Sequence, residues 1–282
     1  MPATPAAAHH LDASAPRGGV GRFFALAYAL TWAPLLPASL ASLGVLSGDP
    51  ADYLAAAPLA VFAPTIAAVI AARREGGKPA VRALLRGLRA WRVRPLWYVV
   101  ALAGPALLFV AARGVYGLVP GAQGGPWLYL PERPEQYAAL LLIPIGEEIG
   151  WRGFALPRLI ARSGAARATA TVGLLWGVWH VPMFLAVGQP LRWVVIGIVF
   201  VAVGNVFFTW FYRRSGASLL LAVLLHVGLH INNPTRADPG DALPLTIVTV
   251  AYAVLAAALV LLDRRAFTGS EPSLGATGRD GA

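Results

Sequence analysis

The sequence contains no cysteine, and charged residues make up only 13% of its 282 residues. Without cysteine there is no disulfide, no thiolate nucleophile and no thiolate metal ligand, so histidine and oxygen or nitrogen donors remain for chemistry. Hydrophobic residues account for 57% of the chain, and its mean hydropathy is +0.64. This composition predicts an all-α, polytopic membrane protein folded as one helical bundle.

Acidic residues are also scarce, because 13 aspartates and glutamates stand against 23 lysines and arginines, which gives a net charge of +10. Nucleic-acid-binding proteins show such a basic excess. In a membrane protein the arginines of cytosolic loops account for such an excess, and in so apolar a chain this is the explanation we favour. We therefore expect a lipid bilayer, and no nucleic acid, among the partners of this chain.

Apolar stretches of about 20 residues, the length needed to cross a bilayer, recur along the sequence. They predict about eight transmembrane helices in a protein that is integral to the membrane, which we expect to be a bacterial plasma membrane. The predicted spans are residues 22–46, 54–73, 95–118, 137–160, 167–187, 192–212, 216–233 and 243–262.

The segments that connect these spans alternate in charge. Residues 73–94 contain seven arginines and one lysine, whereas the next connection contains two glutamates over residues 132–135. Because arginine and lysine concentrate in cytosolic loops, the alternation predicts an even number of spans with both termini in the cytosol. We expect disordered cytosolic tails over residues 1–20 and 266–282, on either side of a transmembrane domain over residues 21–265.

Few ionisable groups lie within the predicted spans. Of the 13 acidic residues only Glu147 and Glu148 do so, together with three of the five histidines, His180, His226 and His230. Such groups are costly in hydrocarbon and persist mainly where they line a polar cavity or carry a function. At a rise of about 1.5 Å per residue, Glu147, His180 and His226 lie near mid-membrane, so three helices can converge on one site.

The spacing of these residues indicates different roles. Glu148 and Arg152 are four residues apart with the acid on the N-terminal side, which favours an ion pair on one helix face. Glu147 then points about 100° away from that pair and is left for chemistry. His226 and His230 are also four residues apart, so both imidazoles can face one cavity.

A carboxylate among histidines is suited to activating water. In one mechanism Glu147 is the general base and a histidine stabilises the developing oxyanion. In the other mechanism a glutamate and histidines bind a divalent metal ion that lowers the pKa of the water. The spacing leaves both mechanisms open and gives no role to Asn205 or Tyr212.

Two other classes of protein compete with a hydrolase. A proton-coupled transporter uses glutamate and histidine as a proton relay, but we find neither the inverted repeats nor the paired broken helices that favour this class. A catalytically silent scaffold or bacteriocin-immunity protein differs from the enzyme only in whether Glu147 is needed for turnover.

The three polar segments resemble the motifs of the CPBP family, the CAAX prenyl endopeptidase and bacteriocin-processing (Abi) intramembrane proteases. The similarity covers about residues 135–235 and includes the order and spacing of the motifs. The residues that carry it are Glu147, Glu148, Arg152, Trp176, His180, His226 and His230.

The resemblance implies an eight-helix, CAAX-protease-like bundle with endopeptidase activity of the glutamate type or the metalloprotease type. It implies that Glu147 activates water and that His180 and His226 bind water or a divalent metal such as Zn²⁺ and stabilise the oxyanion, with no metal as the alternative. The expected substrate is a membrane protein or lipidated peptide, such as a prenylated CAAX-like chain. Two residues depart from the family pattern: Trp176 replaces a phenylalanine, and His230 replaces an asparagine amide.

Our sequence-based hypothesis is therefore an intramembrane endopeptidase whose site opens to the cytosolic half of the bilayer. The expected catalytic residues are Glu147, His180, His226 and His230, supported by Glu148, Arg152 and Trp176.

Overall fold

The computed structural model describes residues 19–122, 131–231 and 241–268, and every regular element in these ranges is helical. The all-α prediction is confirmed for this part of the chain, while the predicted tails lie almost entirely outside it. In chain order the elements are α1 (Val20–Ser42), η1 (Pro50–Ala56), α2 (Ala57–Ala60), α3 (Ala63–Arg86), η2 (Gly87–Arg89), α4 (Pro95–Tyr116), α5 (Pro134–Glu148), η3 (Ile149–Ala155), α6 (Leu156–Ser163), α7 (Ala165–Trp179), α8 (Val181–Ala186), α9 (Leu191–Arg214), α10 (Leu219–Ile231), α11 (Ala242–Leu262) and η5 (Arg264–Ala266).

Five helical stretches in the described ranges are long and apolar enough to cross a membrane: α1, α4, α7 together with α8, α9 and α11. Helix α10 is apolar but shorter. The chain is thus an integral membrane protein with several apolar helices. The predicted span 54–73 is divided among η1, α2 and α3, and the predicted span 137–160 is divided among α5, η3 and α6, so eight spans remain a prediction.

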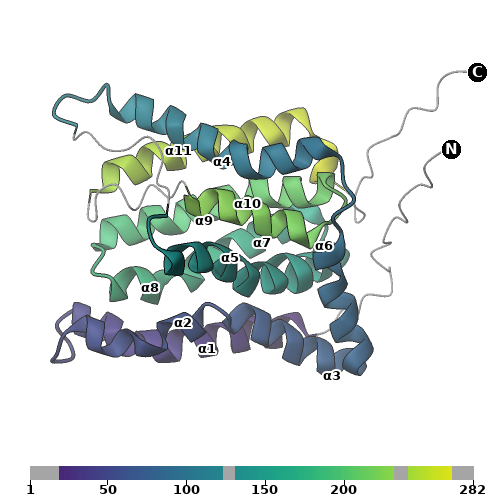
Figure 1. The fold of residues 1–282 in the computed structure, drawn as a ribbon, viewed down its shortest axis with the longest axis horizontal. Helices are drawn as coiled ribbons and strands as arrows, with labels where there is room; N and C mark the ends of the chain where they lie inside the picture. Colours follow the sequence, from purple (N-terminus) through teal and green to yellow (C-terminus); the bar gives the residue numbers. More distant parts are fainter. Residues whose placement is uncertain (1–18, 123–130, 232–240, 269–282) are drawn as a thin grey trace, which may run out of the picture.

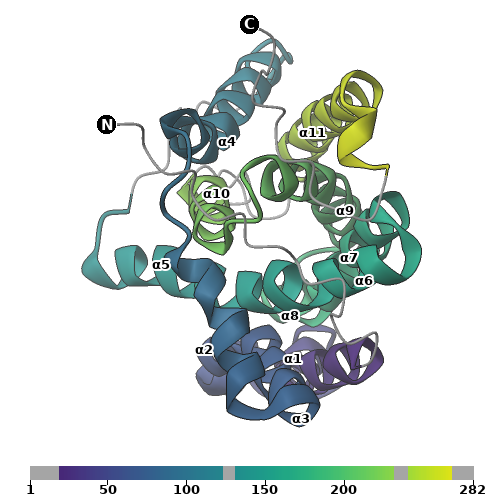
Figure 2. The same ribbon diagram turned by 90° about the vertical axis from the view of Figure 1, so that its right-hand side faces the viewer.

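The helices lie side by side, with α1 and α3 at one edge and α4 and α11 at the other (Figure 1). Helix α10 is enclosed by α4, α5 and α9, and α1 to α3 form an outer layer that contacts α8 and η3 (Figure 2). Any residue on the inward faces of α5, α7 and α10 is therefore shielded by other helices. This enclosure is what allows polar groups to persist inside an apolar bundle.

Helix α3 bends sharply at Gly77, where φ is +63°, a conformation that glycine adopts without strain. The arginine-rich segment beyond the bend crosses the end of the bundle towards α4 (Figure 1). The hydroxyl of Ser218, just before α10, donates a hydrogen bond of 2.7 Å to the carbonyl oxygen of Ala90. This bond ties the crossing segment to the start of α10.

Helix α1 begins and α11 ends at the same end of the bundle, where α6 also lies (Figure 1). There Arg158 of α6 pairs with Glu75 of α3 at 2.7 Å. Arg214, the last residue of α9, pairs with Asp263 after α11, and its hydrogen bonds lower the pKa of the Asp263 carboxyl. The connection between α8 and α9 lies at the opposite end (Figure 1).

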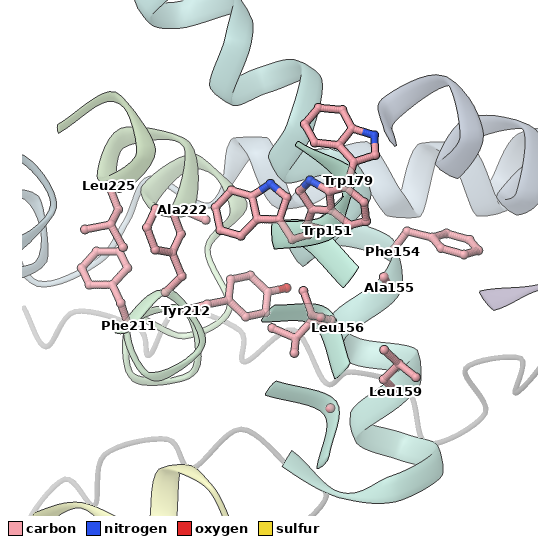
Figure 3. Close-up of a cluster of buried hydrophobic side chains, with 14 of the residues drawn as sticks. Trp151, Phe154, Ala155, Leu156, Leu159, Trp179, Phe211, Tyr212, Ala222 and Leu225 are labelled. Atoms are coloured by element: carbon pink, nitrogen blue, oxygen red, sulfur yellow. The ribbon is translucent and has the colours of Figure 1, made fainter. Parts of the chain in front are cut away.

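An aromatic and aliphatic cluster joins η3 and α6 to α7, α9 and α10 (Figure 3). Trp151 is its centre, with ring centroids 5.4 Å from Phe23 and 5.7 Å from Trp179, both in edge-to-face geometry. Phe211 of α9 and Leu225 of α10 are fully buried on another side of the cluster. Because η3 sits in this cluster, the residues at its start are held in a fixed orientation.

Two glycines bring α7 close to α9. A Cβ atom added at Gly173 would lie 2.9 Å from the carbonyl oxygen of Ala202, and one added at Gly177 would lie 2.7 Å from that of Ile198. Small residues at helix contacts allow such close approach in membrane proteins. The pair therefore sets the position of Trp176 and His180, which are neighbours of Gly177 on the same chain segment.

We expect Gly177→Ala to destabilise the protein by about 1–3 kcal/mol, because the added methyl group forces two backbones apart. Thermal unfolding of the purified protein in detergent measures the effect. Gly114→Ala is the matched control, since a Cβ atom at this position of α4 meets no atom within 4 Å. An equal response of the two variants would contradict the close-packing argument.

Candidate active site

The polar site begins where α5 gives way to the π-helical segment η3. Glu147 and Glu148 are the last two residues of α5, and Pro144 and Gly146 precede them. Proline and glycine weaken a regular α-helix, and π-helical turns occur frequently at functional sites. Close packing of Gly146 and Gly150 against the backbone of Val61 and Pro64 holds this irregular segment against α3 and the residues just before it.

Glu148 is tied into a buried network. Its Oε1 accepts hydrogen bonds of 2.8 Å from Nη1 of Arg152 and 2.8 Å from Nδ1 of His226. Nη2 of Arg152 donates to Oδ1 of Asn205 at 2.8 Å, and Nδ2 of Asn205 donates to the carbonyl oxygen of Thr169 at 2.7 Å. The predicted Glu148–Arg152 contact is therefore present, and the network links α5, η3, α7, α9 and α10.

Asn205 is a polar residue to which spacing assigns no role in this network, because a single asparagine in an apolar helix carries no spacing signal. It is fully buried, and its amide group serves both as an acceptor for Arg152 and as a donor to α7. Only its position in three dimensions reveals this function.

The Arg152 guanidinium lies between two aromatic rings. Its Cζ is 4.1 Å from the ring centroid of Trp176 and 4.4 Å from that of Phe208. A cation–π contact is strongest when the cation is removed from water, as it is here. Arg152 thus faces a carboxylate, an amide and two rings, and it lies behind the site rather than in the pocket.

Glu147 is separate from the ion pair. Its side chain is only 2% exposed, and its Oε2 accepts a hydrogen bond of 2.6 Å from Nε1 of Trp176. It lines the pocket described below. The structure therefore directs the two adjacent glutamates to different surroundings, as their angular separation on the helix predicted.

His180 occupies a break between two helices, since α7 ends at Trp179 and α8 begins at Val181. Its Nδ1 lies 2.7 Å from the carbonyl oxygen of Trp176. A carbonyl oxygen only accepts, so Nδ1 carries the proton and Nε2 presents a lone pair in the neutral ring. The carboxylate of Glu148 also only accepts, so the Nδ1 of His226 carries the proton as well.

His226 and His230 stack with ring centroids 4.8 Å apart and an interplanar angle of 21°. Both line the same pocket as Glu147 and His180. The prediction that the two histidines of α10 face one cavity is confirmed.

The pocket has a volume of about 280 Å³. Trp176 and the four predicted catalytic residues contribute polar atoms to a lining that is otherwise largely apolar and comes from α8, α9 and α11. It reaches Val187 and Gln189 between α8 and α9, at the end of the bundle opposite the start of α1 and the end of α11. The expected opening towards the cytosolic half stays a prediction.

The same side chains are the ones expected to bind a divalent metal. Among the described residues no group of three or more histidine, aspartate or glutamate side chains is arranged to hold a metal ion. Glu147, His180 and His226 line one pocket, yet they do not form such a group. A bound divalent metal stays a prediction.

Fold and site together define a class, an integral membrane protein that holds a glutamate and three histidines in one pocket inside a helical bundle. Residues 134–232 match the family model described as type II CAAX prenyl endopeptidase Rce1-like, so this region is a domain of the Rce1-like (CPBP, Abi) family. The chain is also 26% identical over 136 residues to CAAX prenyl protease 2 of Methanococcus maripaludis, which covers 45% of this chain and 49% of that protein.

The chain thus spans about half the length of this curated relative. The family match runs from the first residue of α5 to just beyond α10 and contains every residue of the predicted site. Helices α1, α3, α4 and α11 lie outside it.

Proposed function

We propose that this protein is an intramembrane endopeptidase that hydrolyses a peptide bond of a membrane-associated substrate with a water molecule activated by Glu147. One observation carries the proposal: Glu147 lies in a pocket beside three histidines and outside the ion pair that Arg152 makes with Glu148. A carboxylate that is not held in an ion pair can accept a proton from water. The family match of this region supports the same reaction class.

The buried charges balance in a way that favours catalysis. Arg152 compensates Glu148. The charge of Glu147 is then compensated when one imidazole of the pocket is protonated, and His226 is the ring whose Nδ1 already donates to a carboxylate. A protonated His226 would present an Nε2–H donor to the pocket. This state contains both a base and an oxyanion donor.

In the proposed reaction the water oxygen bonds to the scissile carbonyl carbon while Glu147 takes a proton from the water. The electron pair of the C=O bond moves to oxygen, and the oxyanion accepts a hydrogen bond from Nε2–H of His226. His180 presents its Nε2 lone pair to the attacking water and orients it. The C–N bond then breaks, and Glu147 transfers its proton to the leaving nitrogen.

The substrate we propose is a membrane protein or a lipidated peptide, prenylated CAAX-like chains included. The apolar lining of the pocket from α8, α9 and α11 supports a substrate of this kind. We further propose eight spans with both termini in the cytosol of a bacterial plasma membrane, which the alternation in charge between the connecting segments supports.

The test is cleavage of a peptide library by the purified protein in lipid vesicles. The peptides share one sequence set and are made with and without a C-terminal prenyl group. We expect cleavage at a defined bond, and we expect it to persist in a metal chelator if Glu147 alone activates the water. Loss of activity that Zn²⁺ restores would establish the metal form, and no cleavage of any peptide would favour a scaffold.

A further inference from the structure

The pocket follows one face of α9. The residues of α9 that line it recur at helical spacing from Trp193 through Gly197 and Gly204 to Phe208. At a rise of about 1.5 Å per residue this face is about 22 Å long. Phe208 packs edge-on against His226, with ring centroids 5.5 Å apart, so His226 lies at one end of this face. The pocket is therefore much longer than the bond to be cleaved.

Tyr252 of α11 lines this pocket and has an unusual hydroxyl group. The side chain is 2% exposed, and its ring stands edge-on to Phe200 with centroids 5.4 Å apart. Its buried hydroxyl has no hydrogen-bond partner among the residues that the structure describes. Buried tyrosine hydroxyls normally have one. Tyr116, by comparison, donates to Oδ2 of Asp241 at 3.2 Å.

A second buried polar atom of the pocket is in the same situation. Oε1 of Gln189, at the end near the α8–α9 connection, has no hydrogen-bond partner within the described ranges. A purely apolar ligand would leave both atoms unsatisfied. An extended peptide carries one carbonyl and one amide per residue, repeated about every 3.3 Å, and offers partners to both.

We propose that Tyr252 is a substrate-positioning residue whose hydroxyl donates a hydrogen bond to a backbone carbonyl oxygen of the peptide lying in the pocket. The inference rests on the proposed endopeptidase function and adds a residue to it from α11, outside the region that matches the family. Fixing a carbonyl along α9 would hold the chain in register with Glu147.

The first test compares Tyr252→Phe with Tyr116→Phe in cleavage and thermal unfolding assays. Tyr252→Phe keeps the ring and removes an unpaired hydroxyl, so it should raise KM by on the order of 3- to 10-fold with kcat and the melting temperature largely unchanged. Tyr116→Phe removes a paired hydroxyl outside the pocket lining, so it should lower the melting temperature and leave KM unchanged.

The second test identifies the peptide carbonyl that accepts the hydrogen bond from Tyr252. In a series of peptides, each carbonyl that flanks the scissile bond is replaced in turn by a methylene group. With the wild type, one peptide of the series should show a rise in KM about as large as the rise that Tyr252→Phe causes with the unmodified peptide. With Tyr252→Phe, the same peptide should show no further rise in KM. The inference is overturned if Tyr252→Phe leaves KM unchanged, or if the two proteins show the same change in KM with every peptide of the series. In either case, cleavage by the wild type leaves the proposed function standing. Absence of wild-type cleavage overturns both.

Discussion

Glu147→Gln should abolish peptide cleavage, with kcat lower by on the order of 10²- to 10⁴-fold, while the protein remains folded. The amide cannot accept a proton from water at neutral pH, but its oxygen can still accept the hydrogen bond that Nε1 of Trp176 donates. Loss of the base is therefore separated from loss of the local structure. Single-turnover cleavage of the best library peptide measures the rate, and thermal unfolding in detergent checks the fold.

The matched control for this prediction is Glu132→Gln, which makes the same chemical change at an exposed residue before α5. It should leave both the rate and the melting temperature unchanged. If Glu147→Gln cleaves as fast as the wild type, Glu147 is not the base and the proposed mechanism is wrong. If the wild type binds the peptide without cleaving it, the protein acts as a binding scaffold.

Arg152→Ala should be the most destabilising of the substitutions considered, with a loss of about 3–5 kcal/mol in the free energy of unfolding. The change leaves the buried carboxylate of Glu148 without its cation and removes the stacking against Trp176 and Phe208. It also leaves Oδ1 of Asn205 without its donor. Unfolding by denaturant in detergent micelles measures the effect.

The effect of Arg152→Ala can be compared with that of two other variants. Arg133→Ala breaks the exposed pair with Glu135 and should cost at most about 1 kcal/mol, because solvent screens such pairs. Glu148→Gln combined with Arg152→Met removes both buried charges while the Gln oxygen still accepts from His226. This double variant should be more stable than Arg152→Ala alone, and a double variant that is less stable would contradict the ion-pair argument.

The helical repeat in the sequence was enough to predict two of the contacts in the site. Glu148 and Arg152, like His226 and His230, lie four residues apart on one helix, so the helical repeat alone brings each pair together. The structure shows both pairs in contact. The same repeat separated Glu147 from the pair, since it lies one residue earlier in the turn.

Contacts between different helices could not be predicted from the helical repeat. Asn205 and Tyr252 come from α9 and α11, and nothing in their neighbouring residues marks them as polar members of a shared interior. The extent of the pocket along α9 likewise follows from which helices pack closely. The glycines at positions 173 and 177 show where α7 and α9 approach, but only with both helices in place.

The sequence by itself determined the class of protein, because hydrophobic runs, scarce charges and helical spacing act through local physics that any membrane helix obeys. It also determined which few polar residues lie within the apolar spans. Tertiary structure alone decided that α5 passes into a π-helical segment, that Asn205 completes the Arg152 network, and that Tyr252 shares the pocket with Glu147. These features depend on packing between segments far apart in the chain, and the periodicity of one helix carries no information about its neighbours.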